Sequence, residues 1–267
     1  MSANYEGFPY LVERIRGTLE VAGPPEGTKR VTLDLVGEAN GKPVTLKGRI
    51  LRNEQRDVEL MLTGSGIVLD QQLIAALPGK FPQLITALHP TARGDFTAKI
   101  RHNEKVRREH GPEEFDNEFD IHVRDGSLNY EEFPYPLRKL MGNLYIRTVP
   151  DTPSMVSPGP GLPVAPAQNE IGSCIFRDFT AVGPGNGQLK ISGSKGPEPG
   201  GNLLQLKVSG EGIRFDGELQ RAVNKLKMDK SWHTYDPSGV MNCEIEVKVH
   251  NRNAVQGQPP QFLPGRD

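Results

Sequence analysis

The sequence has little of what marks most enzymes and metal sites. It contains two cysteines, one tryptophan and only 6% aromatic residues in a length of 267. Its six histidines lack the H-x-x-x-H spacing of a zinc site, and neither a phosphate-binding P-loop nor a G-x-S-x-G motif occurs. We therefore predict no catalytic residue, no metal and no cofactor, and we expect that the protein is not an enzyme.

An excess of charge of one sign is also missing. The 32 Lys and Arg residues nearly balance the 33 Asp and Glu residues, which leaves a formal net charge of −1. The densest basic run, 105–108, is followed within a few residues by an acidic segment, whereas nucleic-acid binding requires a concentrated basic face. We interpret this run as a solvated loop and expect no nucleic-acid partner.

Long apolar runs are absent as well. No stretch approaches the roughly 18 residues that cross a bilayer, and the N-terminus lacks the apolar region of a signal peptide. We expect a soluble chain with no transmembrane segment and no secretion signal of its own. Cys174 and Cys243 lie far apart in sequence, so their pairing stays open, although two core thiols are favoured over a disulfide.

What the sequence does contain is a repeat. Residues 4–21 read NYEGFPYLVERIRGTLEV and residues 129–146 read NYEEFPYPLRKLMGNLYI, with eight of eighteen positions identical. A repeated unit usually buries its apolar face by stacking on its neighbours, so we predict an array. The residues of this motif that we expect to be structural are Tyr5, Phe8, Pro9, Tyr130, Phe133 and Pro134.

A second motif recurs in the same order. Residues 60–77 and 206–223 share the pattern G-x-G-I-x-[LF]-D-x-x-L. The offset between copies is 125 residues at the first motif and 146 at the second. An insertion of about twenty residues in the second copy explains the difference, and the Pro- and Gly-rich stretch at about 148–170 has the composition of a surface loop. We predict a first β-repeat at 4–128 and a second at 129–257.

Both ends of the chain interrupt a repeat. A strand-like run precedes the motif of the second copy but not that of the first, and no third NYExFPY motif follows. This pattern predicts a piece, or a short relative, of a longer array whose ends leave sheet edges unpaired.

Alternation of apolar and polar residues is the dominant local pattern. It runs through 31–36, 44–50, 57–63 and 95–101 in the first copy and most clearly through 241–249 in the second. Strands with one apolar side form antiparallel sheets, whereas strands of parallel sheets show continuous apolar runs. The predicted fold class is mainly β: two tandem repeats of antiparallel strands that form an elongated curved sheet or groove, each with a short amphipathic helix.

The expected helices lie at matched places in the two copies. Asp70 is placed to N-cap a short helix, and Asp216 is placed to N-cap a longer one. A second short turn is expected at 81–88, and single helical turns are expected at 11–15 and 136–140. Because both aspartates recur with the repeat, we interpret them as structural residues.

The two motifs together carry a family resemblance. NYEEFPYPLRKLMGNLYI, an alternating strand region, G-x-G-I-x-L-D-x-x-L-x-x-A-L-P and a downstream H-P-T-A-R-G-D resemble the repeats of large bacterial AsmA-like proteins. The likeness is to long planctomycete-type members, which belong with TamB-like proteins among bridge-like lipid-transfer proteins, and it covers about residues 4–250. It implies a β-groove that conducts phospholipid acyl chains between membranes, further repeats in a parent protein, and a periplasmic or cell-envelope location.

Under this resemblance, apolar side chains of the alternating strands line the groove. Acyl chains would bind there with about 0.8 kcal/mol per buried CH₂, without specific polar contacts. The alternative is a passive β-sandwich or solenoid scaffold that has no lipid groove. The predicted lipid-facing residues are Leu33, Leu35, Leu46, Leu60, Leu62, Leu189, Ile191, Leu204, Leu206, Val208, Ile245 and Val247.

Overall fold

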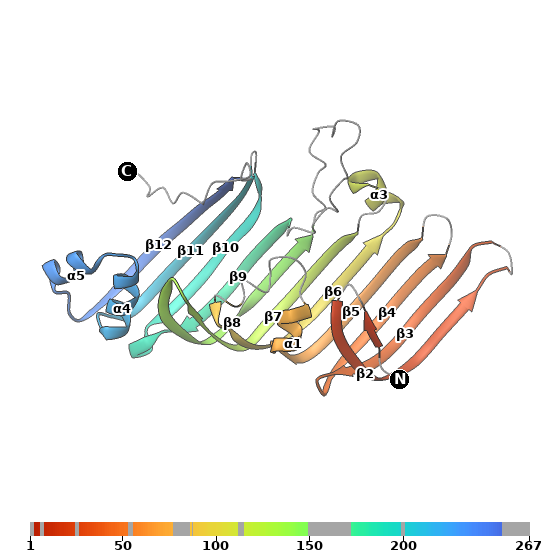
Figure 1. The fold of residues 1–267 in the computed structure, drawn as a ribbon, viewed down its shortest axis with the longest axis horizontal. Coiled ribbons are helices and arrows are strands. Elements are labelled where there is room, and N and C mark those ends of the chain that lie inside the picture. Colours follow the sequence, from red (N-terminus) through yellow and green to blue (C-terminus); the bar gives the residue numbers. More distant parts are fainter. Residues whose placement is uncertain are drawn as a thin grey trace.

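The protein is an open antiparallel sheet. The computed structural model describes residues 3–5, 8–24, 27–52, 56–76, 86, 88–111, 115–148, 172–198 and 201–252. Within these residues, twelve strands lie side by side in chain order, from β1 to β12 (Figure 1). The short β1 pairs with the beginning of β2, and the sheet does not close on itself. The prediction of a mainly β fold with an elongated, curved antiparallel sheet is confirmed.

The described elements have the following bounds. The strands are β1 (Ala3–Tyr5), β2 (Phe8–Ala22), β3 (Lys29–Ala39), β4 (Lys42–Arg52), β5 (Asp57–Val68), β6 (Thr91–His102), β7 (Asp116–Tyr130), β8 (Phe133–Thr148), β9 (Ser173–Val182), β10 (Gln188–Glu198), β11 (Gly201–Arg214) and β12 (Val240–Arg252). The helices are α1 (Gln71–Ala76), α3 (Glu104–His110), α4 (Gly217–Lys225), α5 (Asp229–Tyr235) and the short 3-10 helix η1 (Pro184–Asn186).

Alternation of side chains explains why these segments form strands. In β3, Leu33 and Leu35 are half-buried, whereas Thr32 and Asp34 are exposed. Successive side chains of a strand point to opposite faces of the sheet, so each strand offers one apolar and one polar side. Because the described strands lie in a single sheet, the apolar sides of neighbouring strands lie next to each other.

The shared G-x-G-I motif has the same backbone geometry in both copies. Gly66 and Gly212 have φ values of 64° and 66°, and each lies where a bulge shifts the strand pairing. The Gly66 N–H donates to Oδ1 of Asp95 at 2.9 Å. The Gly212 N–H donates to Oδ1 of Asn242 at the same 2.9 Å. Glycine suits both positions because it adopts this left-handed conformation without a steric penalty.

The aspartate of the same motif begins a helix in each copy. Asp216 accepts hydrogen bonds from the backbone N–H groups of Glu218 and Leu219 at 3.1 and 3.0 Å. Asp70 accepts one from the N–H of Leu73 at 2.8 Å. Each side chain thus satisfies N–H groups that have no partner within the first turn of a helix. These are the N-cap contacts that the sequence predicted.

The NYExFPY motif forms a β-hairpin in each copy. Tyr130 pairs with Phe133 across a two-residue turn, and Tyr5 pairs with Phe8 in the first copy. Pro134 follows at the second residue of β8, near the start of the strand, a position where the missing N–H of proline is tolerated.

The segments after these hairpins are strands, and the prediction of helical turns there was wrong. β2 and β8 continue through them, with bulges at Arg14 (φ 52°) and Lys139 (φ 51°). A bulge adds one residue to a strand, so the apolar side chains on either side of it are three residues apart. Leu137 and Leu140 have this spacing, which also suits one face of a helix.

A helix packs on the strand that follows each hairpin, α1 on β2 and α4 on β8. In the second copy, Leu137 of β8, Ala181 of β9, and Leu219 and Ala222 of α4 belong to one buried cluster. In the first copy, the smaller cluster around Ile67 includes apolar residues of β3, β4, β6 and α1. These two buried clusters therefore lie at the end of the strands that carries α1 and α4, whereas α3 lies at the other end (Figure 1).

Other predictions from the sequence concern the insertion, a helical turn, the cysteines and membrane spans. The proline-rich insertion, apart from Thr148, and most of the turn expected at 81–88 lie outside the described residues. Cys174 and Cys243 are both free thiols. No helix within the described residues has the length and apolar character of a membrane span.

Two matched glycines allow close packing between strands. Gly48 has a φ of 151°, and a Cβ placed on it would lie 2.9 Å from Cα of Leu60. Gly193 has a φ of 154°, and a Cβ there would lie 2.9 Å from Cα of Leu206. Both sites exclude a side chain by conformation and by space.

We predict that Gly193→Ala destabilises the protein by about 3 kcal/mol, because alanine disfavours the positive φ and its Cβ would collide with β11. Urea denaturation followed by circular dichroism measures this loss. Gly196→Ala is a matched control in the same strand, because a Cβ there meets nothing within 4 Å. Its effect should stay within about 1 kcal/mol. Equal losses in the two variants would contradict the prediction.

Candidate functional site: the apolar face of the sheet

The strand register places all of the predicted lipid-facing residues on one side of the sheet. Residues directly opposite each other on neighbouring antiparallel strands point to the same side. Leu46 lies opposite both Leu35 and Leu62. At the other end of the sheet, Leu206 lies opposite Val247. The shared side, which we call the apolar face, carries Leu33, Leu35, Leu46, Leu60, Leu62, Leu189, Ile191, Leu204, Leu206, Val208, Ile245 and Val247.

The middle strands join these two groups of residues. Ala98 of β6 lies opposite both Leu62 of β5 and Phe119 of β7. Phe119 in turn lies opposite Ile146 of β8. The predicted set left these strands out, although residues 119–123 (FDIHV) alternate as clearly as the residues that were chosen. The apolar face therefore extends from β2 to β12.

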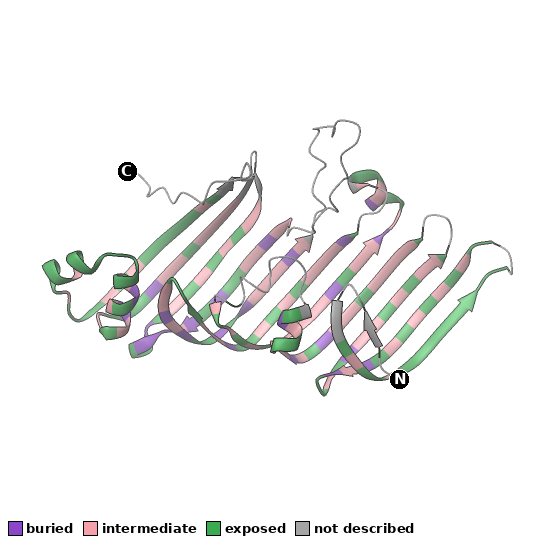
Figure 2. Ribbon diagram, in the orientation of Figure 1, coloured by how far each residue is buried: buried purple, intermediate pink, exposed green. Residues whose placement is uncertain are grey.

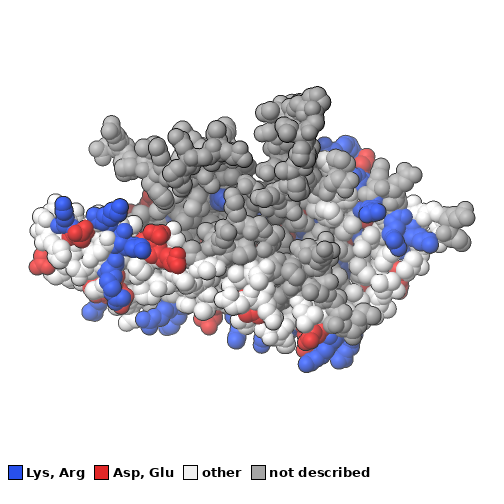
Figure 3. All heavy atoms as spheres, in the orientation of Figure 1, with Lys and Arg blue, Asp and Glu red and all other residues white. Residues whose placement is uncertain are grey.

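Exposure varies across the apolar face. Leu33 and Leu206, in strands that pair on both sides, are half-buried. At the edges of the sheet, Leu19 and Val21 of β2 are each 60% exposed and Ile245 of β12 is 50% exposed. Along the strands, most buried residues lie toward the end that carries α1 and α4 (Figure 2). In the space-filling view, charged side chains gather over α4 and α5 and along the lower rim (Figure 3).

The opposite side of the sheet, the polar face, is crossed by ion pairs. Lys47 of β4 lies 3.2 Å from Asp34 of β3, and Arg49 lies 2.7 Å from Glu59 of β5. All four side chains are substantially exposed, so each pair stabilises the fold by less than about 1 kcal/mol. These exposed charged side chains distinguish the polar face from the apolar face.

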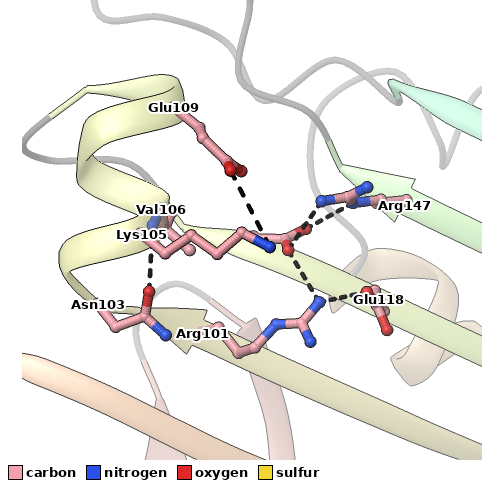
Figure 4. A network of polar contacts seen from close by, with 8 residues as sticks. Arg101, Asn103, Lys105, Val106, Glu109, Glu118 and Arg147 are labelled. Carbon is pink, nitrogen blue, oxygen red and sulfur yellow. Dashed lines mark hydrogen bonds and ion pairs between the residues drawn. The ribbon is translucent and has the colours of Figure 1, made fainter.

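One group of charges on the polar face surrounds a buried carboxylate (Figure 4). The carboxylate of Asp116, whose side chain is 7% exposed, accepts hydrogen bonds from Arg147 at 2.8 and 3.0 Å and from Arg101 at 2.9 Å. Arg101 also pairs with Glu118. Burial acts to raise the pKa of Asp116, but the hydrogen bonds and charges of Arg147 and Arg101 outweigh it and hold this pKa below its ordinary value.

Two other buried groups, a thiol and a phenol, are held in their neutral forms. Burial raises the pKa of the Cys174 thiol to about 11 and that of the Tyr135 hydroxyl to about 12. A neutral thiol is a poor nucleophile. Cys174 lies on the apolar face opposite Ile146, and it contributes packing surface there.

No family model, curated protein or solved structure matches the chain. The resemblance to AsmA-like repeats stays a prediction, and a functional assignment has to come from the chemistry of the two faces.

The Asp116 cluster predicts a defined pH dependence of stability. The pKa of Asp116 is lower in the folded than in the unfolded chain, so its contribution is complete above the unfolded value of about 4 and is lost as pH falls through the folded value. We expect Asp116→Asn to lower the free energy of unfolding by about 1–3 kcal/mol at neutral pH, and this difference to shrink in acid. Urea unfolding across a pH series measures both effects.

The matched control is Asp34→Asn, which removes an exposed ion pair with Lys47. Its effect should stay below about 1 kcal/mol at every pH. A loss for Asp116→Asn that is the same at acid and neutral pH would contradict the role assigned to its charge.

Proposed function

We propose that the protein binds acyl chains of phospholipids or other lipids on the apolar face of its sheet. The observation that supports this most is the continuity of the face, since the register links apolar residues from β3 through β6 to β12. A single sheet covers one side of each apolar side chain and leaves the other side to be covered by something else. An alkyl chain can do this without hydrogen-bonding groups.

The energetics favour a ligand with a long apolar part. Each CH₂ removed from water contributes about 0.8 kcal/mol, so a single long chain can offset the entropy lost on binding. A ligand of this kind needs no particular polar partner. Alternating leucine, isoleucine and valine side chains suit it because they offer surface of one chemical type over many strands.

The apolar face is not uniform, and its polar end suits an amphiphile. At the end of the strands away from α1 and α4, the same side of the sheet carries His102, Asn117 and Lys195. Lys195 lies opposite Cys174 and Leu204, so this cation shares the face with apolar neighbours. The acyl chains of a lipid could lie on the apolar residues while its anionic head group lies toward the cation of Lys195.

The resemblance in sequence suggests a cellular role for such binding. We propose that this surface serves lipid movement between membranes in the cell envelope, where further repeats of a parent protein would extend it. This part of the proposal requires that lipid binds first, so lipid binding is what should be tested.

Lipid binding predicts different effects for neighbouring residues on opposite faces. Leu33→Asn places an amide on the apolar face, and Thr32→Asn places the same amide on the polar face. Loss of one well-covered leucine costs about 1.5 kcal/mol or more, so Leu33→Asn should weaken binding of a fluorescent long-chain fatty acid about tenfold. Thr32→Asn should leave the affinity within about twofold. Titration followed by fluorescence measures both.

Native mass spectrometry of the purified protein supplies a second measurement. Phospholipid should co-purify with the protein and with Thr32→Asn, and less of it should remain with Leu33→Asn. Absence of both co-purified phospholipid and fatty-acid binding would contradict the proposal and favour a passive scaffold.

A further inference from the structure

The last strand of the sheet presents an edge with a regular pattern. β12 pairs with β11 from Gly201 to Arg214, and within the described residues no strand pairs with its other side. Its outer backbone N–H and C=O groups are therefore available for pairing with another strand. On the apolar face of this edge, Ile245 is 50% exposed and Val247 is 37% exposed.

The first copy shows how the equivalent strand is used. β6 corresponds to β12 in the repeat, and it pairs with a strand on each side, β5 and β7. Ala98, which corresponds in position to Ile245, is 1% exposed. Equivalent strands thus pair along both edges in the first copy and along one edge in the second. The free edge of β12 is therefore suited to accept a further antiparallel strand.

The side chains along β12 indicate which strand fits. From Glu244 to His250 the sequence reads EIEVKVH, and it is complementary to itself about Val247. We propose that β12 pairs antiparallel with β12 of a second copy of this chain, with Val247 opposite Val247, so that the second copy extends the sheet at the edge where a further repeat would otherwise add its strands. In this register Glu246 of each copy lies opposite Lys248 of the other. Ile245 lies opposite Val249, so both faces match.

The symmetry of this arrangement is that of an ordinary dimer. A two-fold axis perpendicular to the sheet makes neighbouring strands antiparallel and keeps both apolar faces on the same side. Glu246 already accepts a hydrogen bond from Gln205 at 2.7 Å and pairs with Lys248 of its own chain at 3.1 Å. Both side chains are about half exposed, so they can turn toward a second copy at little cost.

The opposite edge of the sheet is less well suited to such pairing. In β2, a pairing about Thr18 would set Arg16 opposite Glu20, but on the apolar side it would set Gly17 opposite Leu19, which leaves each leucine without a partner side chain. The bulge at Arg14 also shortens the regular part of that edge. The proposal therefore assigns the contact between copies to β12 and not to β2.

A charge swap tests the proposal. Glu246→Lys or Lys248→Glu alone converts both cross-strand Glu–Lys pairs of the dimer into pairs of like charge. We expect each single variant to raise the dimer dissociation constant about tenfold or more, and the double variant Glu246→Lys/Lys248→Glu to restore it to within about threefold. Sedimentation equilibrium over a range of protein concentrations measures the constant, and circular dichroism checks that each variant is folded.

Lys47→Glu is the matched control, because it disrupts an exposed ion pair in the interior strand β4. It should leave the dissociation constant unchanged. The proposal is overturned if the unmodified chain stays monomeric at all concentrations, or if both single variants dimerise as well as the unmodified chain.

Crosslinking tests the register independently of charge. In a background with both natural cysteines replaced by alanine, Val247→Cys should form a disulfide-linked dimer on mild oxidation, since the two thiols would lie directly opposite each other. Leu19→Cys, at the other edge, should not. Crosslinking of Leu19→Cys without Val247→Cys would place the contact at β2 and overturn the proposal.

Discussion

The antiparallel register between neighbouring strands is the constraint on which the rest of the structure depends. Side-chain direction repeats every two residues, so a slip by a single residue would turn a whole strand over and bring its charges among the leucines. The register does shift at the bulges of Arg14, Gly66, Lys139 and Gly212. These bulges lie near the end of the strands that carries the NYExFPY hairpins, α1 and α4. Elsewhere the pairing between β3 and β6 is regular, and this preserves the separation of the two faces there.

Much of the fold could be predicted from the sequence, and the failures have physical causes. Alternation identified the strands because one face of the open sheet is polar and exposed to solvent. The helix caps Asp70 and Asp216 could be predicted because their hydrogen bonds are local. The segments 11–15 and 136–140 were misassigned because a bulge gives a strand the apolar spacing of a helical turn. A single residue with positive φ causes each bulge, and the residue types at these positions, Arg14 and Lys139, do not indicate it.

The candidate site was harder to predict than the strands that form it. Each residue of the apolar face is an ordinary leucine, isoleucine or valine, and the site exists only as the sum of many cross-strand pairs. The sequence placed residues such as Leu33 and Leu206 on apolar sides, but only the register shows that Ala98, Phe119 and Ile146 connect them. Continuity from β2 to β12 is a property of strand pairing, which a single sequence does not specify.

The hairpin and helix that accompany each copy have a consequence for how such a protein can change over evolutionary time. α1 packs on β2 and α4 packs on β8, so each copy supplies the partners for its own helix. A duplication that adds a whole unit brings its own packing with it, whereas one that adds a fraction of a unit leaves a helix or a hairpin without its partner. Sheet length should therefore change in steps of six strands, or about 29 Å at the usual spacing between strands.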